Sequence, residues 1–297
     1  MKAQLTPGKY VVAVSGGVDS MVLLDLLHGL PDVELVVAHF EHGIRKDSDE
    51  DRKLVEAAAK KYGLPFVFAR GNLGAGVSEA TARTVRYNFL RQVQKEQNAQ
   101  AIITAHHQDD VLETAIFNLM RGTGRKGLSA LQSTENLTRP LLHIYKDEIL
   151  AYAREHHIKW REDSTNNDET YKRNFIRRQI MPRLNPQQKA ALAAFVSRAQ
   201  TSNAAIDAML DELIKSGGAT MGRQWFIMLP HQVSREVMAA WLRAHDVRDF
   251  DRPLIERLVI AAKVALPGKL IDVNADLVLH VQKHSLELRK RSPRKNR

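Results

Sequence analysis

The sequence predicts an α/β protein with a parallel, doubly wound sheet, followed by a helical linker and a small α+β domain. Two observations predict the sheet: short apolar runs alternate with helical patterns, and these runs are apolar throughout, as strands covered on both faces are. A third observation, the change to a mainly helical pattern after Leu142, separates the rest of the chain.

Four strands and four helices are expected in the first part of the chain. The strands should lie at 10–14, 35–39, 65–69 and 101–104, and the helices at 21–30, 48–62, 78–98 and 109–121. In such sheets ligands bind outside the carboxyl ends of the strands, where the strand order reverses. Functional residues are therefore expected where strands pass into helices.

The second part should be helical and then mixed. Helices are expected at 145–157, 173–180 and 186–214, then a strand at 224–229, helices at 234–245 and 253–263, and strands at 269–273 and 277–281. Gly217-Gly218 ends the long helix. The expected organisation is a catalytic domain at 1–185, a linking helix at 186–216, a small domain at 217–288 and a disordered basic tail at 289–297.

Composition excludes several classes of protein. The 297 residues contain no cysteine, which excludes disulfides, thiolate zinc sites, iron–sulfur clusters and cysteine nucleophiles. Neither a signal peptide nor an apolar run of membrane-spanning length is visible, so we expect a cytoplasmic protein with no membrane attachment.

The net charge of +10 is unevenly distributed. Residues 1–50 carry 4 basic and 8 acidic side chains, whereas residues 51–200 carry 24 and 15. Such an excess favours a polyanionic partner such as nucleic acid, with an ordinary basic surface as the alternative.

A phosphate-binding loop is predicted at Ser15-Gly16-Gly17-Val18-Asp19-Ser20, between the first strand and the first helix. The glycines let backbone N–H groups approach a phosphate, the helix start favours negative charge, and the serines add hydroxyl donors. Because the Asp19 carboxylate would repel phosphates, we infer Mg²⁺ between them. The alternative is a glycine-rich turn in which Ser and Asp cap the helix.

Other nucleotide loops do not fit. The kinase and GTPase pattern G-x-x-x-x-G-K-[ST] does not occur, and the G-x-G-x-x-G at 122–127 follows a helix, not the strand that a dinucleotide site needs.

A second polar cluster, Thr104-Ala105-His106-His107-Gln108-Asp109-Asp110, follows the fourth strand. It should lie at the same sheet edge as the phosphate loop. His106 and Asp110 are candidates for deprotonating a nucleophile or holding a metal. The alternative is that Asp109 and Asp110 cap the helix and the histidines are structural.

Two arginine pairs, Arg83 with Arg86 and Arg173 with Arg177, share helical faces and could bind phosphates of ATP or RNA. A solvated helix face is the usual alternative.

These motifs resemble the N-type ATP pyrophosphatases and, among them, the tRNA(Ile)-lysidine synthetase family. SGGVDS marks the superfamily, and further matches run in order over residues 10–182. They are His42-Gly43-Ile44-Arg45, Glu79 with Ala82-Arg83 and Arg86-Tyr87, the 104–110 cluster with Glu113-Thr114, Arg121-Gly122 with Gly124 and Gly127-Leu128, Arg139-Pro140-Leu141-Leu142, and Asp163, Asn166, Tyr171, Arg173-Asn174 and Arg177. Phe40-Glu41 departs from the family, which has Val and then Asn or Asp.

The resemblance implies an adenine nucleotide alpha hydrolase-like fold and a ligase. Such an enzyme adenylates the wobble cytidine of an isoleucine tRNA with a CAU anticodon, and free L-lysine then displaces AMP. It implies ATP binding by Ser15, Gly16, Gly17, Val18, Asp19, Ser20 and Arg83, catalysis by Asp19, His106 and Asp110, Mg²⁺ at Asp19, and tRNA binding by Arg86, Arg173 and Arg177. Glu113 is a candidate for holding lysine, and no protein partner is implied.

Three alternatives stay open. A tRNA thiolase of the superfamily would normally need cysteines, which this chain lacks. An amidating synthetase would use ammonia, and usually has a glutaminase partner or a dimerising domain. A catalytically inactive RNA-binding protein would have a decayed phosphate loop, and this loop is intact.

Overall fold

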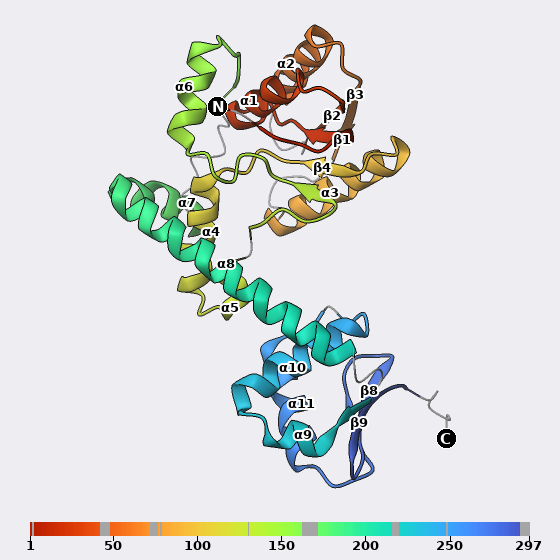
Figure 1. Ribbon diagram of the computed structural model, residues 1–297. Helices are drawn as coiled ribbons and strands as arrows, with labels where there is room; N and C mark the ends of the chain where they lie inside the picture. The colour runs from red at the N-terminus through yellow and green to blue at the C-terminus, as the bar shows by residue number, and fades with distance from the viewer. Residues whose placement is uncertain are drawn as a thin grey trace. The chain divides into compact units, whose positions relative to one another are not determined.

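The computed structural model describes residues 1, 3–41, 48–71, 77, 79–129, 131–161, 172–215, 220–247 and 249–291. It shows two compact units, Met1–Gln200 and Thr201–Arg297. Figure 1 labels their elements.

The first unit contains a five-stranded parallel sheet, so the predicted α/β fold is confirmed. The strands are β1 (Gly8–Ala13), β2 (Val33–Glu41), β3 (Phe66–Arg70), β4 (Ala101–Ile103) and β5 (Leu137–Thr138), in the order β3-β2-β1-β4-β5. The fifth strand was not predicted, because two residues are too few to show a pattern. The strand order reverses at β1, between β2 on one side and β4 on the other.

Helices cover both faces of this sheet, as a doubly wound fold requires (Figure 1). The helices α1 (Val18–Leu27), α2 (Ser48–Lys61) and α6 (Lys146–Glu155) pack on one face, and α3 (Glu79–Glu96) packs on the other. Along β1, Val12 joins the core under α1, whereas Val11 joins Leu90 and Val93 of α3. Both valines are fully buried, which explains the uninterrupted apolar run.

A second apolar layer forms around α4 (Gln108–Met120), beside α5 (Arg125–Leu128). Val111 and Ala115 pack against Val196 in the first part of α8 (Pro186–Lys215). Leu112 packs against Ile176 and Met181. These contacts fix α4, whose first turn carries the polar cluster.

The helix predicted at 173–180 is interrupted. The chain forms α7 (Lys172–Phe175), a π-helical turn (Ile176–Ile180) and a 3₁₀ turn (Met181–Arg183). Pro182 has no N–H, so the carbonyl of Arg178 cannot receive a normal α-helical hydrogen bond there.

The second unit packs helices against a four-stranded antiparallel sheet, as the predicted α+β domain requires. The helices are α9 (Arg223–Met228), α10 (His231–Ala244) and α11 (Arg252–Val264), and the strands are β6 (Thr220–Gly222), β7 (Lys269–Asp272), β8 (Leu277–Val281) and β9 (Ser285–Lys290), in the order β6-β9-β8-β7. Phe226, Trp241 and Leu258 are central to the core, which Leu210 and Ile214 at the end of α8 also join.

Two predictions in this unit need correction. The strand predicted at 224–229 is the helix α9, because the apolar run fits either structure and packing of Phe226 in the core decides between them. Arg289 and Lys290, assigned to the disordered tail, are the last residues of β9. Residues 292–297 of that tail lie outside the described residues.

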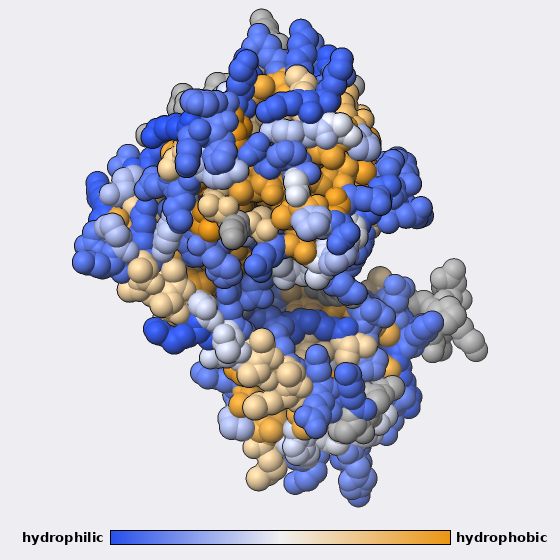
Figure 2. All heavy atoms as spheres, turned by 45° about the horizontal axis from the view of Figure 1, so that its top comes forward, coloured by the Kyte–Doolittle hydropathy of each residue, from blue (hydrophilic) through white to orange (hydrophobic). Residues whose placement is uncertain are grey.

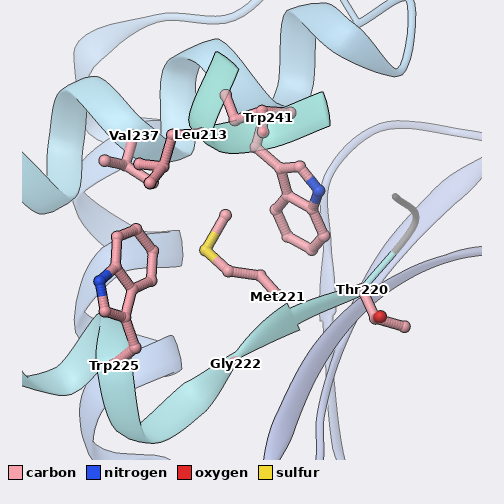
Figure 3. A pocket seen from close by; sticks show the side chains of 8 residues that line it. Leu213, Thr220, Met221, Gly222, Trp225, Val237 and Trp241 are labelled. Atoms are coloured by element: carbon pink, nitrogen blue, oxygen red, sulfur yellow. The ribbon is translucent and has the colours of Figure 1, made fainter. Parts of the chain in front are cut away.

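A pocket of about 180 Å³ lies within the second unit. Figure 3 shows Met221 between the rings of Trp225 and Trp241. All eight lining residues are uncharged: Leu213, Ile214, Thr220, Met221, Gly222, Trp225, Val237 and Trp241. The pocket therefore suits an apolar group and not a phosphate.

Polar and charged side chains predominate on the face of the molecule seen in Figure 2. Of the helices among the described residues, none has the length and apolar character needed to cross a membrane.

A buried arginine ties the second unit together. Arg223 is only 7% exposed, and its Nε donates a hydrogen bond to the carbonyl of Ala262 at 3.0 Å. Its terminal nitrogens donate to the carbonyls of Ala265 at 2.5 Å and Gln282 at 3.1 Å. One guanidinium thus satisfies carbonyls at the end of α11 and at the turn between β8 and β9.

Replacement of this arginine should destabilise the second unit. We expect Arg223→Gln to lower its free energy of unfolding by about 2–4 kcal/mol, because several buried carbonyls lose a charged donor. Urea unfolding followed by tryptophan fluorescence measures this, since Trp225 and Trp241 lie in the unit. Arg252→Gln at the exposed start of α11 is the control, with a change under about 0.5 kcal/mol. Equal midpoints for both variants would contradict the assignment.

Candidate active site

The phosphate loop lies between β1 and α1, and Ser20 closes it. The Ser20 hydroxyl donates to the carbonyl of Gly17 at 2.9 Å and accepts from the N–H of Ser15 at 3.1 Å. Gly17 is the N-cap of α1, so the first N–H groups of this helix face the loop. The Val18 side chain is in the core, which leaves its backbone for ligand binding.

Gly16 requires a glycine. Its φ of +91° is rare for residues with a side chain, and an added Cβ would lie 3.4 Å from the Cβ of Asp51. Its carbonyl accepts a hydrogen bond from the N–H of Arg161 at 3.0 Å, and Arg161 also pairs with Asp51 at 2.8 Å. The loop is therefore held from α2 and from the segment after α6.

The β4–α4 junction meets this loop through His107. His107 is the N-cap of α4, and its N–H donates to Asp110 Oδ2 at 3.0 Å. The Nε2 atom of its buried ring lies 3.8 Å from Asp19 Oδ2 and 3.6 Å from Asp110 Oδ2. The carboxylates of α1 and α4 thus flank one histidine.

His106 lies before the helix, so it does not stack on Asp110 along a helical face. Its Nδ1 atom is 2.9 Å from the hydroxyl of Thr104. Burial lowers the pKa of His106 to about 4, against the raising effect of Asp110 and with the help of Arg139, Arg83 and Arg86. The imidazole is therefore neutral near pH 7.

Two lysines that the sequence analysis missed neutralise the acidic side of this site. Lys146, the first residue of α6, donates from Nζ to Asp19 Oδ1 at 2.5 Å and from its N–H to Asp109 Oδ2 at 2.8 Å. Lys189 of α8 donates to Asp109 Oδ1 at 3.2 Å. The position of Lys146 just after the Arg-Pro-Leu-Leu motif is the signal that could have identified it.

Arg173 and Arg177 both contact α4. Arg177 donates to the two oxygens of Glu113 at 2.8 and 2.9 Å and to Asp110 at 3.3 Å, while Arg173 donates to Thr114 at 3.1 Å. Burial raises the pKa of Glu113, and Arg177 opposes that rise. Burial alone would also raise the pKa of Asp110, but His107, His106 and Arg177 outweigh it, and that pKa is lowered.

A cationic cluster forms around Tyr87. The guanidinium of Arg83 lies 4.7 Å from the Tyr87 ring centroid and that of Arg86 lies 5.8 Å away. Arg83 also donates to the Tyr87 hydroxyl at 3.3 Å. Arg139, which follows β5, is 8% exposed and donates a hydrogen bond to the carbonyl of Gln132. Arg139 and Tyr87 belong to the motifs that carry the family resemblance, but the sequence did not predict them as site residues.

The residues present fit a magnesium ion brought in by a nucleotide. Within the described part of the chain, no three His, Asp or Glu side chains are arranged to hold a metal by themselves. Mg²⁺ commonly uses one or two carboxylates together with substrate phosphates and water. Asp19, beside the phosphate loop and 30% exposed at its side chain, matches that pattern.

Glu41, the departure from the family pattern, is buried and paired. Its Oε2 accepts a hydrogen bond from Nε of Arg70 at 2.8 Å, so the carboxylate is neutralised by the neighbouring strand. The motif residues 42–45, 163, 166 and 171 and the side chain of Glu79 lie outside the described residues.

Residues 1–184 match the PP-loop domain family. A tRNA(Ile)-lysidine synthase from Thermotoga sp. (strain RQ2) is 39% identical over 207 residues, which are 65% of this chain and 50% of that protein. One from Lactiplantibacillus plantarum is 35% identical over 268 residues, which are 84% of this chain and 59% of that protein. The chain thus spans about half the length of the relatives it matches, and the resemblance seen in its motifs is confirmed.

Among solved structures, the U34-tRNA thiolase NcsA from Methanococcus maripaludis with its [4Fe-4S] cluster has a TM-score of 0.54. It is 19% identical, and the match covers 66% of this chain and 74% of that one. This similarity shows a shared fold.

The neutral state of His106 can be tested by NMR titration of the histidine rings. We expect a midpoint near pH 4 and not near the ordinary 6.5. Because Asp110 raises this pKa, Asp110→Asn should move the midpoint lower still. The unfolded chain binds this proton near pH 6.5, so folding should lose stability as the pH falls from about 6.5 towards 4. A midpoint above pH 6 would contradict the burial argument.

Proposed function

Because the chain belongs to the PP-loop domain family, we propose that it is an ATP-dependent ligase that forms lysidine in an isoleucine tRNA. The observation that carries the proposal is the grouping of Asp19, His107 and Asp110 beside the phosphate loop. Its relatives, named tRNA(Ile)-lysidine synthase, support the choice of substrate.

The reaction joins L-lysine to C2 of the wobble cytidine in a CAU anticodon. The C2 carbonyl is a poor electrophile, so its oxygen first attacks the α-phosphate of ATP and pyrophosphate leaves. The ε-amine of lysine then attacks C2 and AMP departs. The modified tRNA reads AUA in place of AUG.

The phosphate loop binds ATP in this proposal. Ser15, Gly16, Gly17, the backbone of Val18, and Ser20 surround the phosphates, and Arg83 contributes a cation. Asp19 would hold Mg²⁺, which would supply positive charge to offset the negative charge of the phosphates. Lys146, which donates to Asp19 at 2.5 Å, orients that carboxylate in the free protein.

Lysine must lose a proton before it attacks, since its ordinary pKa is about 10.4. Asp110 or His106 receives the proton. Both are weak bases, because their pKa values are lowered. The transfer therefore requires a lowered pKa at the bound amine, which burial beside Arg177 and Lys146 would produce. Glu113 is the candidate partner of the second lysine amine.

The tRNA binds to a basic surface in this proposal. Arg86, Arg173 and Arg177 contact its phosphates, and the small domain at 217–288 adds a surface of matching shape. Its substrates place the enzyme in the cytoplasm, without a protein partner.

The direct test is release of pyrophosphate from ATP by the purified protein. We expect release that depends on L-lysine and on isoleucine tRNA with a CAU anticodon. Methionine tRNA, which has the same anticodon, is the control and should support less than about a tenth of the rate. Equal rates with both tRNAs, or no tRNA-dependent release, would refute the proposed substrate.

Replacement of Asp19 tests the metal role. Asp19→Asn should slow pyrophosphate release at least about a hundred-fold, or about 2.7 kcal/mol of transition-state stabilisation, because a neutral amide binds Mg²⁺ weakly. Asp32→Asn is the matched control: Asp32 is exposed, and asparagine tolerates its φ of 59°. Full activity in the Asp19 variant would show that this carboxylate holds no essential cation.

A further inference from the structure

We propose that His39 is a positioning residue: its ring holds the peptide group that enters the phosphate loop, and through this peptide it keeps Ser20 in place to close the loop around a nucleotide. The choice of ATP as that nucleotide rests on the proposed function. The contacts of His39 are made by the chain itself and do not depend on that choice.

His39 lies near the carboxyl end of β2, on the face of the sheet that α1 and α2 cover. Side chains alternate along a strand, and Val37, two residues earlier, packs in the core on that face. His39 is 3% exposed. Its ring stacks on Phe68, the residue paired with it in β3, with the ring centroids 5.9 Å apart. A histidine is thus enclosed in the core beside apolar neighbours.

One hydrogen bond compensates for the burial of this ring. The Nδ1 atom lies 2.7 Å from the carbonyl oxygen of Val14. Because a carbonyl only accepts, Nδ1 must carry the proton. Burial lowers the pKa of His39, so the ring is neutral near pH 7 and Nε2 carries no proton. The Nε2 atom is buried without a hydrogen-bond partner in the described part of the chain, which is costly, so packing alone would favour an apolar side chain here.

The bond from His39 reaches the first peptide of the phosphate loop. Val14 follows β1 and precedes Ser15, and the peptide that joins them is trans, so the carbonyl of Val14 and the N–H of Ser15 point in opposite directions. His39 holds the carbonyl, and the N–H donates to the Ser20 hydroxyl at 3.1 Å. That hydroxyl donates in turn to the carbonyl of Gly17 at 2.9 Å. The orientation of one peptide thus links His39 to the hydrogen bonds that close the loop.

The next part of the loop is held by a different kind of donor. The carbonyl of Gly16 accepts from the backbone N–H of Arg161 at 3.0 Å, a bond that replacement of a side chain leaves in place. The N–H of Val14 donates to the carbonyl of Ala38 at 3.0 Å and continues the pairing of β1 with β2. The carbonyl of Val14, by contrast, is held by the His39 side chain, so this contact can be removed by substitution.

Two replacements of matching shape test the role of His39. Asparagine places an amide N–H where the Nδ1 atom of histidine lies, whereas leucine has nearly the same shape and no donor. We expect His39→Asn to bind Mg²⁺-ATP within about two-fold of the wild type, and His39→Leu to raise the Kd at least about five-fold, because a loosely held loop must be ordered on binding. Titration calorimetry on the full chain, without tRNA or lysine, measures both values.

Thermal unfolding supplies a readout that separates positioning from packing. Both replacements lose the ring contact with Phe68, and the amide of asparagine adds a buried polar group, so His39→Asn should have the lower unfolding midpoint. The order of ATP affinity should therefore be opposite to the order of stability. Affinity that follows stability, or wild-type affinity in both variants, would make His39 a packing residue and overturn the proposal. If His39→Leu does not fold, His39→Phe, which keeps a ring and lacks a donor, replaces it.

His245 provides a matched control. Its Nδ1 atom makes a comparable contact in the second unit, 2.9 Å from the carbonyl oxygen of Trp241. His245→Leu should leave the Kd of ATP unchanged. An equal loss of affinity in this control would show that removal of a histidine hydrogen bond anywhere suffices, which contradicts a specific role for His39.

The tautomer of His39 is a test that needs no nucleotide. Two-bond ¹H–¹⁵N correlation spectra of the free protein should show a proton on Nδ1 and none on Nε2. A proton on Nε2 would remove the donor from the bond with Val14, and the proposal would fail.

The outcomes separate this inference from the proposed function. Weaker ATP binding by His39→Leu, restored in His39→Asn, in a protein that forms no lysidine would support the role of His39 and refute the function. Lysidine formation together with ATP binding that is insensitive to both replacements would refute the role of His39 and leave the function.

Discussion

The reversal of strand order at β1 is the constraint on which the site depends. β1 pairs in parallel with β2 on one side and β4 on the other, so the chain leaves β1 and β4 in different directions. The first turns of α1 and α4 therefore face each other above one edge of the sheet. Asp19 and His107 come within 3.8 Å, although they are far apart in the sequence.

The residue at which α4 begins then determines the surroundings of each histidine in the polar cluster. Because the helix begins at Gln108, His107 caps it and faces the two carboxylates, whereas His106 remains on the strand side among guanidiniums. The two adjacent histidines thus differ because both precede the helix, and successive side chains of an extended backbone point to opposite sides.

The features that could be predicted from the sequence have local causes. Buried parallel strands require uninterrupted apolar runs, and a tight phosphate loop requires glycine, so both leave a clear pattern. The contacts of Lys146 with Asp19 and of Glu41 with Arg70 join distant segments, so they produce no local sequence pattern that could be recognised. The helix α9 was mistaken for a strand, because the apolar run within it has no periodicity that separates helix from strand. The packing of Phe226 in the core favours the helix.

At this edge of the sheet, the acidic side chains have counterions from the chain itself, whereas some of the basic side chains do not. An ammonium group entering beside Asp19 or Glu113 must compete with Lys146 or Arg177, which already hold those carboxylates. Arg139, by contrast, has no carboxylate partner among the described ion pairs, and its buried Nε atom has no hydrogen-bond partner. Bound phosphates would also draw the neighbouring lysine and arginine side chains towards themselves, which weakens their hold on the carboxylates. In the proposed reaction, a bound nucleotide would therefore lower the electrostatic cost of admitting the lysine amine beside these carboxylates.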